Sequence, residues 1–273
     1  MTYSQLCEAL MDAGIENADF EAALLINFFC KKSRAEILGN PDAQYNEKAL
    51  FDAIDKRCER YPLQYIFGEW DFYGETYTVN ENCLIPRPDT ELLVEYAIKN
   101  LPRGARFADL CTGSGCIAVS TLVHRPDTEA VGLDLFEETA ALAAHNGKRN
   151  GVSDRLSIVC ADLLAGNQFR DGEFDAIISN PPYIRTAVVD TLEEELFSEP
   201  RAALDGGEDG LVFYKKILKD YKRSLKKGGF ILFEIGYDQG ADICALAKSH
   251  GFFCQVRKDL SGNDRMAILR EEI

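Results

Sequence analysis

The sequence lacks the residue groupings of a metal centre or a disulfide framework. It contains no C-x-x-C pair, and its three histidines, His124, His145 and His250, are far apart in the chain. The nine cysteines are odd in number and scattered, which is typical of reduced thiols in a cytoplasmic protein rather than of paired cystines. We therefore expect no metal site, no disulfide framework and a cytoplasmic location.

Long apolar segments and an excess of basic residues are missing as well. No apolar run reaches the length of about 20 residues that a membrane-spanning helix needs, and no charged-then-apolar signal peptide begins the sequence. With 30 Lys and Arg against 45 Asp and Glu, the net charge is -15. A broad electrostatic footprint on nucleic acid needs a basic face. We expect neither membrane association nor stable binding of nucleic acid.

The chain has 273 residues and an ordinary hydrophobic content of 46%, which suffices for one medium and one small domain. Residues 1–62 carry apolar positions at helical spacing, such as Leu6 and Leu10, and predict a small helical domain for packing or partner recognition. In residues 63–83, aromatic residues alternate with glycines, which predicts a β-hairpin linker. Residues 84–273 form the third and largest part.

The largest part repeats strand, loop and helix in the manner of an α/β fold. Its last two strands are adjacent in sequence, which fits an antiparallel pair at the edge of a sheet. We predict a Rossmann-like sheet of seven strands, mostly parallel, with one antiparallel strand in its edge region. The predicted strands are residues 106–111, 129–134, 156–162, 174–179, 230–235, 252–256 and 266–270.

A glycine-rich turn follows the first of these strands. Gly113 and Gly115 let the backbone approach a ligand closely, and Asp134 ends the next strand about 20 residues later, where a carboxylate accepts ribose hydroxyls. This pattern fits a nicotinamide dinucleotide as well as other nucleosides. Asp109 argues against the dinucleotide, because a carboxylate just ahead of the loop repels a pyrophosphate but suits an ammonium or sulfonium group. Asp162, at the end of the third strand, either accepts an adenine amino group or caps a helix.

The fourth strand ends in a rigid corner, Asn180-Pro181-Pro182-Tyr183. Neither proline can donate a ladder hydrogen bond, so the strand stops there. The Asn180 side-chain oxygen and the Pro181 carbonyl are two neighbouring acceptors, which suit a planar group with two N–H donors, such as a primary amide or an exocyclic amine. The Tyr183 ring offers a face on which such a group stacks. The alternative is a plain Pro-Pro turn that closes the strand.

Two further stretches accompany this arrangement. Arg87 stands between two prolines, an unusual beginning for a helix, which indicates a positioning role. Asp89 or Thr90 is expected to cap the helix that begins at Leu92. Residues 185–210 are irregular and acidic, which favours a solvated face, although a loop of this length beside a site is also a candidate lid.

Together these motifs resemble the class I S-adenosylmethionine-dependent methyltransferases. Within them the sequence is similar to the PrmC/HemK family, the protein-(glutamine-N5) methyltransferases that modify peptide chain release factors. The Asn-Pro-Pro-Tyr motif alone is shared with adenine-N6 DNA methyltransferases. The resemblance becomes specific because the Ile-Pro-Arg-Pro-Asp-Thr-Glu stretch also occurs, at the right distance ahead of that motif in the chain. Cys111 departs from the family pattern, because many such loops have glycine there. The resemblance covers nearly the whole chain and is carried by residues 62–66, 85–91, 111–115, 180–184, 199–201 and 206–210.

The resemblance implies S-adenosyl-L-methionine as the cofactor, S-adenosyl-L-homocysteine as its product, and no metal. It places the loop from Cys111 to Gly115 around the methionine part of the cofactor, Asp109 near its charged end, Asp134 on the ribose, and Asp162 and Leu163 beside the adenine. The implied cofactor-binding residues are Asp109, Cys111, Thr112, Gly113, Ser114, Gly115, Asp134, Asp162, Leu163 and Asn180.

The resemblance also implies the substrate, the glutamine in the Gly-Gly-Gln loop of class I peptide chain release factors, methylated at the side-chain nitrogen N5. Residues 1–62 would recognise the substrate and residues 84–273 would form the methyltransferase domain of a monomer. Catalytic roles fall to Asn180, Pro181 and Tyr183, and substrate contacts to these three with Pro182 and Arg87.

Other functions remain open at this point. The first is an amino-methyltransferase acting on adenine N6 in nucleic acid, which shares the corner but is disfavoured by the net charge of -15. A glutamine methyltransferase of a ribosomal protein is a second, and the Pro-Arg-Pro-Asp-Thr-Glu stretch favours the release-factor type over it. A non-catalytic binding protein of the same fold and a nicotinamide oxidoreductase are the remaining alternatives.

Overall fold

A computed structural model describes residues 1–271 and divides them into two compact units. The helical unit comprises Met1–Gly68 together with Glu193–Ser198. The sheet unit comprises Glu69–Leu192 and the residues from Glu199 onward. Within the described residues, none of the helices is both long enough and apolar enough to span a lipid bilayer.

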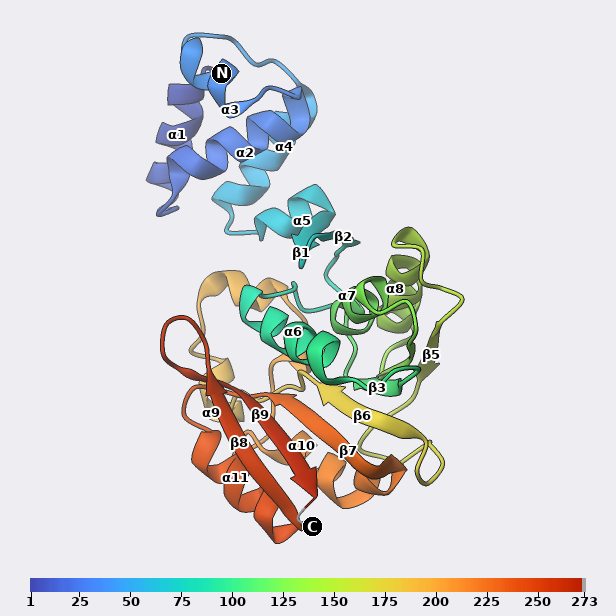
Figure 1. The fold of residues 1–273 in the computed structure, drawn as a ribbon. Helices are drawn as coiled ribbons and strands as arrows, with labels where there is room; N and C mark the ends of the chain where they lie inside the picture. The colour runs from blue at the N-terminus through green and yellow to red at the C-terminus, as the bar shows by residue number, and fades with distance from the viewer. Residues whose placement is uncertain (272–273) are drawn as a thin grey trace. The chain divides into compact units, whose positions relative to one another are not determined.

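The helical unit is built from amphipathic helices around one apolar core (Figure 1). Two of its helices begin with reciprocal capping, in which Thr2 accepts from the Gln5 amide and Ser33 accepts from the Glu36 amide. Leu6, Leu10, Leu25 and Ile26 are fully buried in the core at the helical spacing that the sequence predicts. The helices are α1 (Tyr3–Asp12), α2 (Ala18–Cys30), α3 (Arg34–Gly39), α4 (Lys48–Cys58) and α5 (Leu63–Phe67).

Helix α5 corrects the prediction that a hairpin begins at residue 63. Pro62 has φ -57° at the N-cap, which suits a helix start, and Gly68 ends the helix in the left-handed region at φ 71°. The Phe67 ring stacks on Phe28 of α2 with centroids 4.4 Å apart, a contact that alternation along the sequence does not reveal. The hairpin is confined to β1 (Glu69–Phe72) and β2 (Glu75–Thr78).

Residues 193–198, far away in the sequence, belong to the helical unit through a buried cation. The Arg57 guanidinium is only 4% exposed, and its Nη2 lies 3.0 Å from Glu21 Oε1 and 2.9 Å from Glu195 Oε1. Burial of an unpaired arginine would be costly, so the two carboxylates are needed together. Glu195 is thus paired, with its side chain still 37% exposed, whereas Glu193 and Glu194 of the same acidic run are exposed, as the solvated face predicts. It lies in the 3₁₀ segment η2 (Glu194–Ser198).

The sheet unit contains one seven-stranded sheet in the order β5-β4-β3-β6-β7-β9-β8. Neighbours pair in parallel except β9, which is antiparallel to both β7 and β8. This arrangement confirms the predicted Rossmann-like sheet with an antiparallel strand near its edge. The strands are β3 (Arg106–Leu110), β4 (Glu129–Asp134), β5 (Leu156–Cys160), β6 (Phe174–Ser179), β7 (Leu225–Glu234), β8 (Phe252–Lys258) and β9 (Asp264–Glu271).

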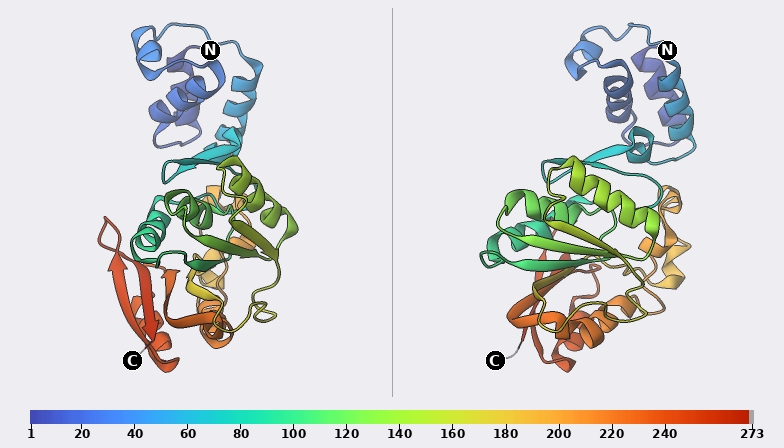
Figure 2. Two further views of the ribbon diagram at one scale, coloured as in Figure 1. Left: turned by 45° about the vertical axis from the view of Figure 1, so that its right-hand side comes forward. Right: turned by 90° about the vertical axis from the view of Figure 1, so that its right-hand side faces the viewer.

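Helices cover both faces of this sheet (Figures 1 and 2). One face carries α6 (Glu91–Asn100), α7 (Cys116–His124) and α8 (Glu137–Arg149), and the other carries α10 (Val212–Lys216), the π-helical turn η4 (Ile217–Tyr221) and α11 (Gly240–Ser249). Because both faces are covered, the central strands are mostly apolar, and Ile177, Ile231 and Phe233 are fully buried. The short elements are α9 (Thr186–Val189), η1 (Pro88–Thr90), η3 (Arg201–Ala203) and η5 (Lys222–Ser224).

Strands β3 and β6 form the switch point of the sheet. From β3 the chain proceeds to β4 and β5 on one side, whereas β6 continues to β7 on the other. Leu110 of β3 stands beside Ser179 of β6, and the Ser179 hydroxyl donates to the Leu110 carbonyl at 2.6 Å. Since parallel strands end at the same edge, the loops that follow both residues emerge side by side, which is where open α/β sheets bind ligands.

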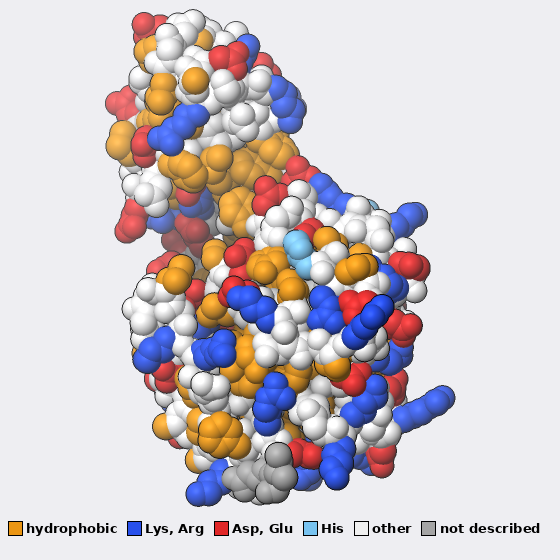
Figure 3. Space-filling model, in the orientation of Figure 1, with side chains coloured by type: hydrophobic (Ala, Val, Ile, Leu, Met, Phe, Trp, Pro, Cys, Tyr) orange, Lys and Arg blue, Asp and Glu red, His pale blue; other side chains and the backbone are white. Residues whose placement is uncertain are grey.

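Charged side chains of both signs are mixed on the surface. Figure 3 shows Lys and Arg interspersed with Asp and Glu on the face that it presents. Several basic side chains of the sheet unit are paired, for example Arg106 with Glu129 at 2.9 Å and Arg149 with Glu69 at 2.7 Å. Such exposed pairs contribute little to stability, but they leave little unpaired positive charge at these positions.

The glycines near residue 210 pack against the Asn-Pro-Pro-Tyr corner. A Cβ on Gly206 would lie 2.7 Å from the Pro182 carbonyl oxygen, and a Cβ on Gly210 would lie 2.5 Å from that of Tyr183. The buried Gln239 side chain joins the two segments, because its Nε2 donates to the Tyr183 carbonyl at 3.0 Å and to the Gly210 carbonyl at 3.2 Å. These glycines support the corner, in an acidic stretch for which the sequence favoured a solvated face.

Gly210→Ala is expected to lower the melting temperature more than Gly251→Ala does. Both glycines have positive φ, 71° and 85°, so each alanine costs about 1 kcal/mol for its left-handed backbone, or roughly 2–4 °C in Tm. Only the Gly210 Cβ meets a backbone atom, whereas the Gly251 Cβ meets nothing within 4 Å. Thermal unfolding of both variants measures the difference, and equal shifts would contradict the close packing at the corner.

Candidate functional site

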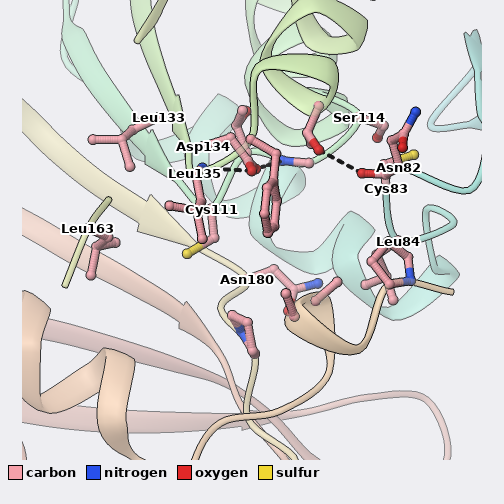
Figure 4. Close-up of a pocket in the computed structure, with 18 of the residues that line it drawn as sticks. Asn82, Cys83, Leu84, Cys111, Ser114, Leu133, Asp134, Leu135, Leu163 and Asn180 are labelled. Atoms are coloured by element: carbon pink, nitrogen blue, oxygen red, sulfur yellow. Dashed lines mark hydrogen bonds between the residues drawn. The ribbon is translucent and has the colours of Figure 1, made fainter. Parts of the chain in front are cut away.

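A cavity lies in the sheet unit where β3, β4 and β6 end (Figure 4). Figure 4 shows Asp134, Cys111 and Ser114 on one side of it and Asn180 on another. The stretch around Arg87 and the segment from Pro200 to Ala203 complete the wall. The predicted site residues that line the cavity are Arg87, Cys111, Thr112, Gly113, Ser114, Asp134, Asp162, Leu163, Asn180 and Pro182. The predicted residues Asp109, Gly115, Pro181 and Tyr183 are not among its lining residues.

The glycine loop makes a sharp turn into α7. Gly113 and Gly115 have φ 56° and 81°, and a Cβ on Gly115 would lie 3.2 Å from the Ala143 side chain of α8. Cys111 adopts φ 60° as well, in a region where a side chain costs roughly 1–2 kcal/mol. The family's glycine at this position is thus explained by the backbone. Burial raises the pKa of the Cys111 thiol well above its ordinary value, so the group is neutral at pH 7.

Asp134 is held by the backbone around the cavity. Its Oδ2 accepts from the Gly113 amide and its Oδ1 from the Leu135 amide, each at 2.8 Å. These bonds fix the carboxylate at the end of β4 beside the cavity, although burial raises its pKa above the ordinary value. Each carboxylate oxygen has a second acceptor position, so Asp134 can still receive a pair of hydroxyl groups.

Asp109 lies beneath the glycine loop and is completely buried. Its Oδ2 accepts from the Thr112 hydroxyl at 2.6 Å and from the Ala118 amide at 3.2 Å, whereas its Oδ1 has no hydrogen-bond partner among residues 1–271. Burial, with a smaller contribution from the nearby Asp134, raises the pKa of Asp109 to about 7 against the lowering effect of the hydrogen bonds from Thr112 and Ala118. An orphaned buried acceptor favours a ligand with positive charge or N–H donors close to the loop.

Asp162 and Leu163 lie at the wall of the cavity beyond the end of β5. The Asp162 Oδ1 accepts from the Leu164 amide at 2.7 Å within a turn. No helix lies among the described residues between β5 and β6, so the prediction that Asp162 caps a helix is wrong. The bond leaves the other carboxylate oxygen available, and the predicted contact with an adenine stays a prediction. Leu163 is 3% exposed and presents an apolar surface to the cavity.

The Asn-Pro-Pro-Tyr corner places Asn180 and Pro182 at the cavity wall. The Asn180 Nδ2 donates to the Thr90 hydroxyl at 3.3 Å, which leaves Oδ1 as the group for a ligand. Pro181 is buried, and Tyr183 is partly buried with its ring against the main core of the sheet unit. The corner is thus fixed by the packing of Tyr183 and by the hydrogen bond from Gln239 to the Tyr183 carbonyl.

Arg87 is joined to a buried carboxylate. It forms an ion pair with Glu199, whose side chain also accepts from the Ile85 amide at 3.0 Å. Glu199 is 5% exposed, and burial raises its pKa against the opposing effect of the Arg87 charge. This pair holds the Pro-Arg-Pro stretch against the segment that follows Ser198. Sequence reasoning found Arg87 but gave Glu199 no role.

Sequence reasoning gave Glu234 no role and Thr90 only a capping role. Thr90 was expected to cap α6, but its side chain makes no capping bond and donates to Glu234 Oε2 at 2.6 Å instead. The sequence does contain a signal for Glu234: it is an acidic residue at the end of a strand, as Asp134 is at the end of β4. As for metals, the part of the chain from Met1 to Glu271 contains no cluster of three or more His, Cys, Asp or Glu side chains suited to an ion.

Comparisons with known proteins agree with this geometry. The family model for the methyltransferase small domain matches residues 88–232, and that for the PrmC N-terminal domain matches residues 3–68. The release factor glutamine methyltransferase of Caulobacter vibrioides is 37% identical over 269 residues, which cover 96% of this chain and 92% of the relative. The chain belongs to the release factor glutamine methyltransferase family. The Clostridium botulinum member is 36% identical, with 96% and 95% covered.

A solved structure supports the fold of the sheet unit. A methyltransferase from Pyrococcus furiosus is 18% identical and covers 71% of this chain and 87% of its own, with a TM-score of 0.54. The family models and the named relatives confirm the resemblance found in the motifs, and the sheet topology together with this structural likeness confirms the predicted fold class. As a member of this family, the chain is an S-adenosylmethionine-dependent methyltransferase. The positively charged cofactor fits a cavity bordered by Asp134 and Asp162 with the orphaned Asp109 oxygen beneath its loop.

The ligand-free protein is expected to lose stability as the pH rises from about 4 to about 7, in part through Asp109. The pKa of Asp109 is 3.8 in the ordinary state and about 7 when folded, so the folded form retains a proton that the unfolded form releases. Asp109→Asn removes the loss of stability that comes from this proton. The free energy of unfolding of the variant, minus that of the wild type, should therefore increase as the pH rises across this range. Denaturant unfolding at pH 5 and pH 8 measures it, and a difference independent of pH would contradict the assignment.

Proposed function

We propose that this chain transfers the methyl group of S-adenosyl-L-methionine to the side-chain nitrogen N5 of the glutamine in the Gly-Gly-Gln motif of class I peptide chain release factors. S-adenosyl-L-homocysteine is the second product. The observation that carries the proposal is the Asn180 amide, whose nitrogen is engaged by Thr90 and whose oxygen remains for a ligand at the cavity. The names of the relatives point to the same substrate.

In this proposal the cofactor occupies the part of the cavity around the glycine loop. Residues Cys111, Thr112, Gly113, Ser114 and Gly115 surround the methionine portion. Asp109, from below the loop, compensates the charged end, and its orphaned Oδ1 supports this role. Asp134 receives the ribose hydroxyls, and Asp162 and Leu163 border the adenine, in keeping with their place at the wall.

The glutamine amide is proposed to bind at the corner. Asn180 Oδ1 and the Pro181 carbonyl accept its two N–H groups, while Pro182 and Tyr183 shape the surface beside it. Arg87, fixed by Glu199, contacts the substrate at the cavity wall. A carbonyl is the only hydrogen-bonding group that a proline backbone offers, which fits an acceptor role for Pro181.

The chemistry follows from these acceptors. An amide nitrogen is a poor nucleophile, because its lone pair is delocalised into the carbonyl. Two acceptors on its hydrogens favour a localised lone pair aimed at the methyl group, and they stabilise the positive charge that develops on nitrogen. Alignment of the two reactants supplies much of the remaining acceleration. The nitrogen–methyl bond forms as the sulfur–methyl bond breaks, and the amide proton then leaves to solvent.

The proposal extends to partners and location. The release factor is a protein substrate, the enzyme acts as a monomer, and it works in the cytoplasm without a metal. The net charge of -15 and the mixed charges seen in Figure 3 favour a protein substrate over nucleic acid. Recognition of the release factor is assigned to the helical unit, and the methyltransferase domain begins after the hairpin.

The deciding experiment combines the purified chain, labelled S-adenosylmethionine and a purified class I release factor. Peptide mass spectrometry then locates the label. A single methyl group on the Gly-Gly-Gln glutamine is the expected result, and a release factor with that glutamine replaced by alanine is the matched control. Transfer to a ribosomal protein or to adenine in nucleic acid, with none to the release factor, would overturn the proposed substrate.

Asn180→Ala is expected to lower kcat by about 100-fold or more while the affinity for S-adenosylhomocysteine changes little, because the variant removes an acceptor that acts on the reacting nitrogen. Asn100→Ala is the control, since Asn100 only donates to the Tyr96 carbonyl of its own helix and lies outside the cavity. Steady-state kinetics and calorimetric titration measure the two effects. Full activity of Asn180→Ala would exclude this mechanism.

A further inference from the structure

Two buried side chains, those of Thr90 and Glu234, lie behind Asn180, and so far only the hydrogen bond from Asn180 to Thr90 has entered the proposed function. Glu234 ends β7, which pairs with β6 so that Phe233 stands beside Ser179, one residue before Asn180. Thr90 lies at the start of α6, where it makes no capping bond. Each of the two side chains belongs to a residue that is 2% exposed, so neither is a surface residue that happens to be polar.

The three residues form a directed chain of hydrogen bonds. The Thr90 hydroxyl donates to Glu234 Oε2 at 2.6 Å, and the Thr90 oxygen accepts from Asn180 Nδ2 at 3.3 Å. A threonine hydroxyl has a single hydrogen. Since the carboxylate takes that hydrogen, the lone pairs of Thr90 are the only groups left to face Asn180, and they attract its NH₂ group and repel its oxygen.

The direction of this chain depends on the charge of Glu234. Complete burial, with a smaller contribution from the Asp89 charge, raises the pKa of Glu234 to about 7 against the lowering effects of the Thr90 hydrogen bond, the Arg265 charge and the Asn180 side chain. Arg265 in turn forms two ion pairs: its Nε lies 3.2 Å from Asp89 Oδ2, and its Nη2 lies 3.2 Å from Asp259 Oδ2. Burial of a carboxylate is unfavourable for stability. A role in orienting Thr90 and Asn180 accounts for the presence of Glu234 at this position.

We propose that Thr90 and Glu234 are positioning residues that fix the orientation of the Asn180 amide, so that its oxygen and not its nitrogen meets the methyl acceptor. This inference rests on the proposed function. It adds a determinant of specificity: an oxygen at this point selects a donor, the N–H of an amide. With the amide reversed, Asn180 would present N–H groups, bind the carbonyl oxygen of the glutamine and turn its nitrogen away from the methyl group.

The test replaces the hydroxyl of Thr90 without changing its shape. Thr90→Val removes the oxygen that accepts from the Asn180 NH₂ group, so the preference of the Asn180 amide for this orientation is weakened. We expect kcat to fall on the order of 10-fold, the equivalent of one lost hydrogen bond of about 1.4 kcal/mol, while the Kd for S-adenosylhomocysteine stays within twofold. Thr90→Ser keeps the hydroxyl and should recover most of kcat.

Thr121→Val is the matched control for this substitution. Thr121 is also fully buried, on α7, and its hydroxyl has no hydrogen-bond partner among the described residues. The same chemical change there should leave kcat unaltered. A merely structural role of Thr90 would lower stability and cofactor binding together with activity, whereas a positioning role lowers kcat alone.

Glu234→Gln tests the chain from its other end. The glutamine NH₂ can donate to the Thr90 oxygen, which releases the Thr90 hydrogen toward Asn180 Oδ1 and favours the reversed amide. We expect a loss of kcat similar to that of Thr90→Val, and no further loss in the double variant. If valine prevents folding, Thr90→Ala and Glu234→Gln provide the same comparison.

The outcomes separate this inference from the function on which it rests. If the wild type fails to methylate the release factor, the proposed function fails before any variant is compared. If the wild type is active and both Thr90→Val and Glu234→Gln retain full kcat, the positioning role is overturned and the function stands. Additive losses in the double variant would likewise contradict a single chain through Asn180.

Discussion

The parallel pairing of β3 with β6 is the constraint on which the site depends. It sets Leu110 beside Ser179, so that the glycine loop and the Asn-Pro-Pro-Tyr corner leave the sheet at the same edge. These two motifs are almost 70 residues apart in the chain, and the Ser179 hydroxyl bond to Leu110 has a sequence separation of 69. In the proposed reaction, this reversal of the strand order brings the loop that holds the cofactor and the corner that holds the substrate to one edge of the sheet.

Around this edge, buried carboxyl groups lower the stability of the fold but orient the side chains and backbone beside them. Asp109, Glu234 and Glu199 are carboxyl groups with raised pKa values, and in each the largest cause is burial. Each is held by specific donors: Thr112 for Asp109, Thr90 for Glu234, and Arg87 with the Ile85 amide for Glu199. Buried polar groups of this kind are expensive unless they are paired, and here each lies directly behind a wall of the cavity.

Much of this could be predicted from the sequence, because the signals are local. Short apolar runs ending in Asp134 or in Asn180 indicate strand ends, and the glycines after Leu110 indicate a close turn. What could not be predicted depends on tertiary partners. The aromatic pattern after residue 63 predicts a strand, whereas the contact of Phe67 with Phe28 belongs to helix α5. The position of Thr90 before a helix predicts a cap, whereas its hydroxyl donates to Glu234, 144 residues away in the chain.

The central claim is that the corner presents two acceptors to an amide nitrogen. A crystal structure of the chain with S-adenosylhomocysteine and a Gly-Gly-Gln release-factor fragment tests it most directly. The account predicts the glutamine nitrogen at about 3 Å from both Asn180 Oδ1 and the Pro181 carbonyl, on the side of the cavity that faces the cofactor sulfur. A glutamine whose carbonyl oxygen faces Asn180, or whose amide lies away from the corner, would contradict it.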